Sequence, residues 1–329
     1  MKSTRMHSVP SGSALGSRSD NGATHSLRAA LFLVLAATIA FAPSAWAQYG
    51  RGSTGNTPPP VPGQNINGMH IYMWGGLKSH GEGAHDYPLF LAEWSKALTE
   101  HGAVVDGAFH PPSAADLDKT DVVLIYKGDA GFLSDAEKEI LETYVKRGGG
   151  LVSFHDSLCG PDPAYFSTLV GGAKKHGEVN YSSGPIVYTV VDKTNPILKD
   201  FSDMTITDES FYSITWAPGM HPLVNTVIPG GEHKGEVVTQ MWTYEHTVPG
   251  GQPARAFVWM QGHAFTNFAI PQIQSTLLRG IAWAGRKPVD ELAAYVAPPA
   301  AARGGGRGGS GRGGRGGSGG GGRGAVAAQ

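Results

Sequence analysis

Residues 256–284 of the 329-residue chain read AFVWMQGHAFTNFAIPQIQSTLLRGIAWA, and this stretch combines three signals. Residues 256–260 form an apolar run that is typical of a buried strand. Gly262-His263 follows the run directly, and Pro271 stands where proline favours the first turn of a helix. Because ligands of open α/β sheets bind at the carboxyl ends of the strands, His263 is the first candidate functional residue.

The residues upstream alternate between strand and helix signals. Residues 122–126 are continuously apolar, as expected of a strand that is covered on both faces. Ser134 and Glu137 match a capping box that begins a helix, and the glycines at 148–150 end it. The order predicts an α/β fold with a doubly wound, mostly parallel sheet and extra β-structure in its second half. The expected strands are residues 69–74, 103–109, 122–126, 151–154, 186–191, 223–228, 237–242 and 256–260, with helices at 88–101, 134–145 and 271–285.

The two ends of the chain differ in composition from its centre. Residues 29–42 read AALFLVLAATIAFA, the length of a signal-peptide core, and Ala45-Trp46-Ala47 matches a cleavage site. Residues 1–47 are therefore expected to be a signal peptide, so that the protein is exported and keeps no stable membrane anchor. The alternative is an uncleaved anchor. A Pro/Gly-rich linker is expected at 48–66, the folded domain at 67–297, and a disordered Arg-Gly-rich tail at 298–329.

Charge and cysteine content narrow the class of protein further. The net charge of the whole chain is −1, but the tail carries five arginines, so the domain before it is acidic. An acidic domain is poorly suited to the phosphate backbone, and no nucleic-acid partner is expected. Cys159 is the only cysteine, so no internal disulfide can form and folding must depend on a hydrophobic core.

Histidines and carboxylates gather where the expected strands end. His85 lies in the loop after the first strand, His155 follows the fourth, and His263 follows the last, while Asp208-Glu209 precede an aromatic segment. Histidine titrates near neutral pH and can act as an acid or base. Three His/Asp/Glu ligands with an open position are typical of catalytic zinc. The alternative interpretation is structural, with these side chains capping helices or hydrogen-bonding across loops.

Cys159 offers a different route to catalysis, because His155 stands four residues before it. The residues around Cys159 lack the Gly-x-Cys-x-Gly pattern of a nucleophile turn, so a small buried cysteine is the favoured interpretation. A hydrolase that uses Cys159 is the third hypothesis for function.

An ordered set of segments resembles the ThuA-like family, which is named for trehalose utilisation. The resemblance covers about residues 69–286. At two places the chain departs from the family pattern: Asn195 stands where the family often has histidine, and residues 249–253 replace a short Gly-Lys-Gly turn. The matching pieces are Tyr144-Val145 with the glycines 148–150, Leu151-Val152 and His155; Leu169-Val170-Gly171-Gly172 with His176; Asp208-Glu209-x-x-Tyr212; and Gly262-His263 with the LLRGIxWA ending at 277–284.

The resemblance implies a class I glutamine amidotransferase-like fold, which is a flavodoxin-like arrangement of three layers. At the turn where amidotransferases carry a nucleophilic cysteine this chain has His155, so glutaminase activity is not expected. Members of the family are linked to disaccharide and 3-keto-glycoside metabolism. The resemblance therefore implies a small carbohydrate as the partner.

These observations lead to one main hypothesis, an exported enzyme that acts on a disaccharide or 3-keto-glycoside by acid/base or metal-assisted chemistry. The alternative is a non-catalytic carbohydrate-binding or scaffold protein on the same fold. The expected catalytic residues are His155, His263 and Glu209; the expected substrate-binding residues are His85, Asp208 and Tyr212; and the expected ligands of a divalent metal such as zinc are His85, His155 and His263.

Overall fold

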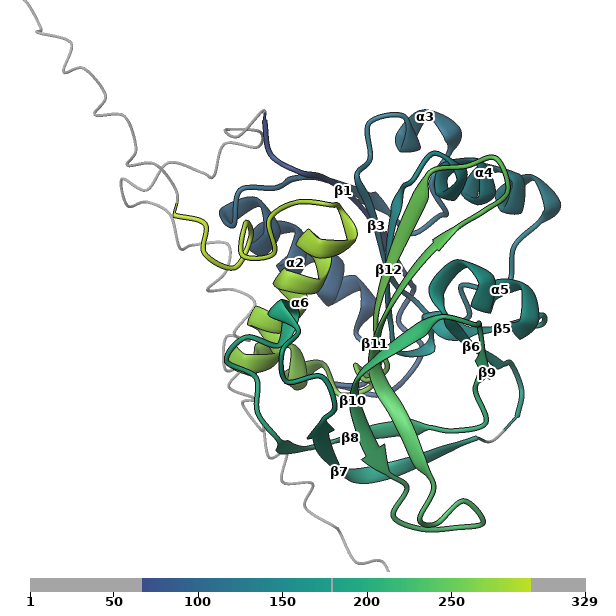
Figure 1. Cartoon of the computed structure of the whole chain (residues 1–329), viewed down its shortest axis with the longest axis vertical. Coiled ribbons are helices and arrows are strands. Elements are labelled where there is room, and N and C mark those ends of the chain that lie inside the picture. Colours follow the sequence, from purple (N-terminus) through teal and green to yellow (C-terminus); the bar gives the residue numbers. More distant parts are fainter. Residues whose placement is uncertain (1–66, 179, 297–329) are drawn as a thin grey trace, which may run out of the picture. The chain divides into compact units, whose positions relative to one another are not determined.

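The computed structural model describes residues 67–178 and 180–296, which form a large mixed sheet covered by helices (Figure 1). The expected signal peptide (1–47), linker (48–66) and tail (298–329) lie outside the described residues. Nine strands follow one another in the order β2-β1-β3-β4-β12-β11-β10-β7-β8. Their bounds are β1 His70–Gly75, β2 Val104–Ala108, β3 Val122–Tyr126, β4 Gly150–Phe154, β7 Tyr181–Val190, β8 Met204–Phe211, β10 Met220–Val227, β11 Val237–Thr247 and β12 Pro253–Trp259.

The sheet has a parallel half and an antiparallel half. Strands β2, β1, β3, β4 and β12 pair in parallel, as the alternation of strands and helices predicts. From β12 onward the neighbours β11, β10, β7 and β8 pair antiparallel. The extra β-structure predicted for the second half therefore continues the same sheet. A separate three-stranded sheet consists of β5 Cys159–Gly160, β6 Gly172–Lys175 and β9 Thr215–Trp216.

Helices cover the parallel half on both faces, which makes three layers (Figure 1). Helices α2 (Tyr87–Glu100) and α6 (Pro271–Ala284) pack on one face, where Phe90, Leu277 and Trp259 share a buried cluster. The other face carries α3 (Ala114–Leu117), α4 (Asp135–Lys146) and α5 (Pro163–Val170) around a second buried cluster. The three-layer α/β fold expected from the sequence is confirmed. None of the helices among the described residues combines the length and apolar character needed to cross a membrane.

Local sequence accounts for where the helices begin. The side chain of Ser134 accepts a hydrogen bond from the backbone N–H of Glu137, and the Glu137 carboxylate accepts one in return, so the predicted capping box starts α4. Proline stands in the first turn of α2 and of α6, where its missing N–H costs no hydrogen bond. At the end of α4, Gly148 reverses the chain with a φ of 93°, a conformation that favours glycine.

Among the nine strands of the large sheet, β8 is the one that the sequence analysis missed; it also missed the short elements α3, α5, β5, β6 and β9. The burial of β8 alternates, but the inward positions include Asp208 and Ser210 instead of apolar residues. Strand prediction depends on alternating hydrophobicity, and polar side chains that belong to a buried network break that signal. The unpredicted strand therefore already points to a functional site at its end.

Gly280 sets how closely α6 packs on the sheet. A Cβ at this position would overlap the ring of Phe257 on β12. Alanine gains about 1 kcal/mol of helix propensity over glycine, whereas overpacking a core costs about 1–3 kcal/mol. We expect Gly280→Ala to lower the free energy of unfolding by up to about 2 kcal/mol, measured by denaturant titration. Gly230→Ala is the control, because a Cβ there meets open space; equal effects of the two changes would contradict this packing argument.

Candidate metal centre

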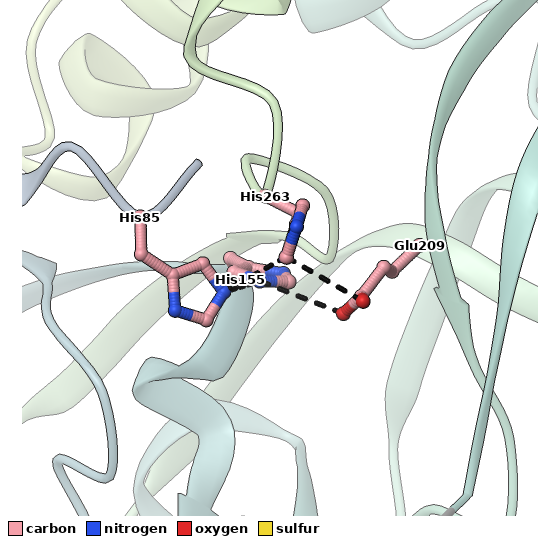
Figure 2. Close-up of side chains that lie close together, drawn as sticks. All are labelled: His85, His155, Glu209 and His263. Atoms are coloured by element: carbon pink, nitrogen blue, oxygen red, sulfur yellow. Dashed lines mark hydrogen bonds and ion pairs between the residues drawn. The ribbon is translucent and has the colours of Figure 1, made fainter. Parts of the chain in front are cut away.

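Four side chains converge where the parallel half of the sheet meets the antiparallel half (Figure 2). His85 comes from the loop between β1 and α2, His155 directly follows β4, Glu209 lies on β8, and His263 follows β12. One nitrogen or oxygen from each residue lies within 4.8 Å of all the others. Residues that are far apart in the sequence thus form one compact cluster of metal-ligating atoms.

The imidazole of His85 lies on one side of the cluster and contacts both of the other histidines (Figure 2). Its Nε2 atom lies 2.8 Å from Nε2 of His155 and 2.9 Å from Nδ1 of His263. His85 and His155 are almost completely buried. Burial, followed by the neighbouring His155, lowers the pKa of His85 to about 3, so this imidazole is uncharged at neutral pH. Burial also lowers the pKa of His263. Uncharged imidazole is the form that binds metal ions.

The Glu209 carboxylate completes the cluster on its other side. Its Oε2 atom lies 3.9 Å from Nε2 of His155, and its Oε1 atom lies 3.5 Å from Nδ1 of His263. Ligands about 2.1 Å from a tetrahedral zinc ion lie about 3.4 Å from one another, and the four measured separations are spread around that value. Three imidazole nitrogens and one carboxylate oxygen are a donor set that suits zinc and similar divalent ions. The residues present therefore fit a metal ion.

The outer ring nitrogens of two histidines have partners that orient the rings. Nδ1 of His155 lies 3.3 Å from the backbone oxygen of Met260, and Nδ1 of His85 lies 3.2 Å from the hydroxyl of Ser79. A proton held on Nδ1 by such an acceptor leaves the lone pair of Nε2 facing the cluster. This is the usual outer arrangement of metal-bound histidine.

The backbone at two of the histidines adopts a conformation that is rare for residues other than glycine. The φ angle is 48° at His85 and 52° at His155. Such angles persist where the surrounding structure holds them, and they cluster at functional sites. The backbone N–H of His85 donates to the backbone oxygen of His263 at 3.0 Å, which joins the two loops that carry these ligands.

Asp208 was expected to bind substrate, but in the structure its carboxylate accepts hydrogen bonds from the loop after β12. The side chain is buried and accepts hydrogen bonds from the backbone N–H groups of His263 and Ala264, each at 3.1 Å, and of Gly262. The Asn267 side chain also donates to it, at 2.7 Å. The carboxylate also accepts from the backbone N–H of Glu209 at 2.7 Å, but most of its donors come from the loop after β12, so it positions His263.

A buried network behind the cluster was not foreseen from the sequence. The Gln261 side chain donates to the backbone oxygen of Glu209 at 3.1 Å and accepts from the Tyr188 hydroxyl at 2.5 Å. The indole N–H of Trp259 donates to the same hydroxyl at 3.0 Å. These contacts fix the end of β8 against the end of β12. The only sequence signal for them is the polar Gln261 directly after an apolar strand.

Asp156 is a second carboxylate at the cluster, outside the metal-ligating group. Its Oδ2 atom lies 3.7 Å from Nε2 of His85, and its side chain keeps 25% of its surface exposed. Burial raises the pKa of Asp156, whereas His155, Lys174, His85 and the hydrogen bond from Cys159 lower it, and the pKa lies below the ordinary value. Asp156 is thus a carboxylate beside the cluster that is not one of the four metal-ligating residues.

The remaining candidates from the sequence lie apart from the four ligands. Tyr212, expected to bind substrate, stacks its ring on His233 at 4.2 Å between centroids. Among the described residues, no hydrogen bond, ion pair or ring contact joins Tyr212 to the cluster. His176 pairs with Asp129 at 2.7 Å on the surface. Cys159 is buried and donates to Asp156, and burial raises the pKa of its thiol, which is unfavourable for a nucleophile.

The comparisons with known proteins concern most of the described chain. A family model described as trehalose utilisation (ThuA) matches residues 82–284, which include all four cluster residues. A search of curated proteins gave no significant match.

Several solved structures share the general architecture at low identity. A protein described as ThuA-like from Bacteroides uniformis is 17% identical, with 69% of this chain and 94% of that chain covered and a TM-score of 0.49. A cytoplasmic protein from Salmonella typhimurium is 14% identical, with 66% of this chain and 98% of that chain covered and a TM-score of 0.44. A glutamine amidotransferase from Thermotoga maritima is 12% identical, with 68% of this chain and 91% of that chain covered and a TM-score of 0.33. All three scores lie below 0.5, so these likenesses carry no argument about the chemistry of this chain.

We expect Asp208→Asn to destabilise the loop that carries His263. The amide would place a donor against backbone N–H groups that now donate to a carboxylate, and an unsatisfied buried donor costs about 1–3 kcal/mol. Denaturant titration should show that the free energy of unfolding falls by about 1–3 kcal/mol. Asp118→Asn is the control, since Asp118 is exposed. If Asp208→Asn lowers the free energy of unfolding no more than Asp118→Asn does, the positioning role of Asp208 is contradicted.

Proposed function

This chain belongs to the ThuA family of trehalose utilisation, and we propose that it acts on a disaccharide or an oxidised (3-keto) glycoside at a divalent-metal centre. The metal would be held by His85, His155, Glu209 and His263. One observation carries the proposal: three imidazole nitrogens and a carboxylate oxygen meet within 4.8 Å.

The chemistry that suits this site is removal of a proton beside a sugar carbonyl, or addition of water. A bound divalent ion would supply a Lewis acid for the substrate oxygen or for water. The base must come from a group that the ligands leave unused, and the carboxylate of Asp156 is such a group, 3.7 Å from His85. Asp156 would take the proton, and its partly exposed side chain leaves it accessible to substrate.

We expect purified protein without an affinity tag or chelator to contain about one divalent metal ion per chain. His155→Ala and His263→Ala should each remove most of it, because both rings supply a ligand nitrogen. Elemental analysis by mass spectrometry measures the stoichiometry. The matched control is His221→Ala, an exposed histidine that pairs with Asp192 at 2.9 Å and should not change the metal content.

An absence of metal in the wild-type protein, also after incubation with zinc, manganese, nickel or iron, would contradict the metal centre. Sugar binding without turnover, measured by calorimetry, would then favour the non-catalytic carbohydrate-binding protein.

We expect Asp156→Asn to separate catalysis from metal binding. The amide has the same shape but cannot accept a proton, and loss of a general base lowers turnover by about 10²–10⁴-fold. Turnover of a 3-keto-glycoside should fall by that factor while the metal content stays at the wild-type value. Asp192→Asn, which changes a surface carboxylate, is the control. Undiminished turnover in Asp156→Asn would exclude Asp156 as the base.

The proposed place of action is outside the cytoplasm. The apolar run at 29–42 and the Ala45-Trp46-Ala47 site support cleavage after Ala47. We expect the protein recovered from the source cells to begin at Gln48 and to be found in the periplasmic or extracellular fraction. N-terminal sequencing checks the first point, and an intact N-terminus on protein from the cytoplasmic fraction would contradict export.

A further inference from the structure

The loop after β3, residues 127–133, lies at the rim of the proposed metal centre and contributes none of its four ligands. In the sheet order, β3 stands between β1 and β4. The loop after β1 carries His85, and His155 directly follows β4. Because β1, β3 and β4 run parallel, the loop after β3 leaves the sheet at the same edge and between the segments that carry these two histidines.

Backbone hydrogen bonds fix this rim to residues 156–160, the turn that comes directly after the fourth-strand histidine. The N–H groups of Asp129 and Gly131 donate to the backbone oxygens of residues 156 and 159, at 3.0 and 2.9 Å. From the segment after β6, the N–H of His176 donates to the backbone oxygen of residue 160 at 2.9 Å. Two segments that are distant in the sequence are therefore held against the same turn beside the centre.

Asp129, Phe132 and His176 form one exposed group on these segments, called the rim cluster below. Oδ1 of Asp129 lies 2.7 Å from Nδ1 of His176. The rings of Phe132 and His176 meet nearly at right angles, with 5.0 Å between centroids. The backbone N–H of Phe132 donates to the backbone oxygen of Asp129 at 3.2 Å, which closes the turn that joins them. Phe132 is 52% exposed and the His176 side chain 50%, so a ligand has access to both.

The rim cluster offers the two kinds of contact that a sugar ring can make. The C–H groups of a pyranose ring form an apolar face, and covering an exposed phenylalanine ring with apolar surface is favourable. The face of an aromatic ring is also the negative side of its quadrupole, which suits C–H groups. Sugar hydroxyls can donate to the Asp129 carboxylate and to Nε2 of His176, which forms no hydrogen bond within the described part of the chain.

We propose that the rim cluster binds the second sugar ring of a disaccharide while the ring that reacts lies at the metal centre. This inference rests on the proposed function and adds residues that determine its specificity. Phe132 is the platform for the second ring, and Asp129 and His176 accept hydrogen bonds from its hydroxyls. The rim cluster makes or breaks no bond of the substrate. It therefore increases the affinity for disaccharides over single-ring glycosides and leaves the chemical step unchanged.

Two substrates that share the reacting ring test this inference. 3-Keto-trehalose carries a second glucose ring, and methyl 3-keto-α-glucoside carries a methyl group in its place. We expect the metal-loaded wild-type protein to have the lower KM for the disaccharide. Phe132→Ala should raise that KM about tenfold and leave kcat unchanged, because the platform binds ground state and transition state equally. The KM for the methyl glycoside should stay at its wild-type value.

Three further variants make the result specific. Phe132→Trp keeps a flat ring and should keep the preference for the disaccharide. His176→Ala removes a hydrogen-bond acceptor and should raise the KM for the disaccharide about three- to tenfold. Phe109→Ala is the matched control: this phenylalanine is 48% exposed and follows β2, two strands away from β3, so neither KM should change. Melting temperature and metal content are measured for every variant.

The outcomes separate this inference from the proposed function. Equal KM values for the two substrates in the wild-type protein, or an equal change of both in Phe132→Ala, overturn the rim cluster as a second-ring site and leave the metal centre unaffected. If the wild-type protein turns over neither substrate, the proposed chemistry fails, and calorimetry with trehalose decides about the rim cluster. Weaker binding by Phe132→Ala than by Phe109→Ala then supports it, whereas equal binding or none overturns it.

Discussion

The Asp208 carboxylate is the interaction on which the arrangement of the site depends. It lies on β8, at the edge of the antiparallel half, and accepts hydrogen bonds from the loop that follows β12 in the parallel half. The adjacent residue on β8 is Glu209, and the loop carries His263, so one buried anion brings a carboxylate ligand and an imidazole ligand together. The hydrogen bonds from several backbone N–H groups offset the cost of removing the carboxylate from water, so the side chain can stay buried.

The contact between these two elements requires a strongly curved sheet. Strand β8 is five strands away from β4 in the sheet order. Neighbouring strands lie about 4.8 Å apart, so the two would be about 24 Å apart in a flat sheet. Yet the Glu209 carboxylate on β8 lies 3.9 Å from His155, the residue after β4. Twist and curling of the antiparallel strands, visible in the lower part of Figure 1, bring the edge of the sheet back over its centre.

The sequence predicted the parallel half better than the site. Residues 122–126 and the Ser134 capping box carry strong local signals, and the structure has a strand and a helix there. The ends of parallel strands meet at one edge, so His85, His155 and His263 could be expected together, and the structure brings them together with Glu209. The role of Asp208 could not be read in advance. It depends on which partners surround a buried carboxylate, and those partners come from the loop after β12, whose contact with β8 no local pattern encodes.

The spacing of the four cluster residues along the chain has a consequence for how an ion at the proposed centre would be acquired. Positions 85, 155, 209 and 263 are distributed over most of the described domain, and no two of them belong to one element. No fragment made during synthesis can hold more than part of the set. An ion at the proposed centre would therefore not serve as a nucleus for folding, as it does in zinc fingers whose ligands are close in sequence. It would bind after the contacts between distant segments have formed, so the assembled polypeptide would select the metal.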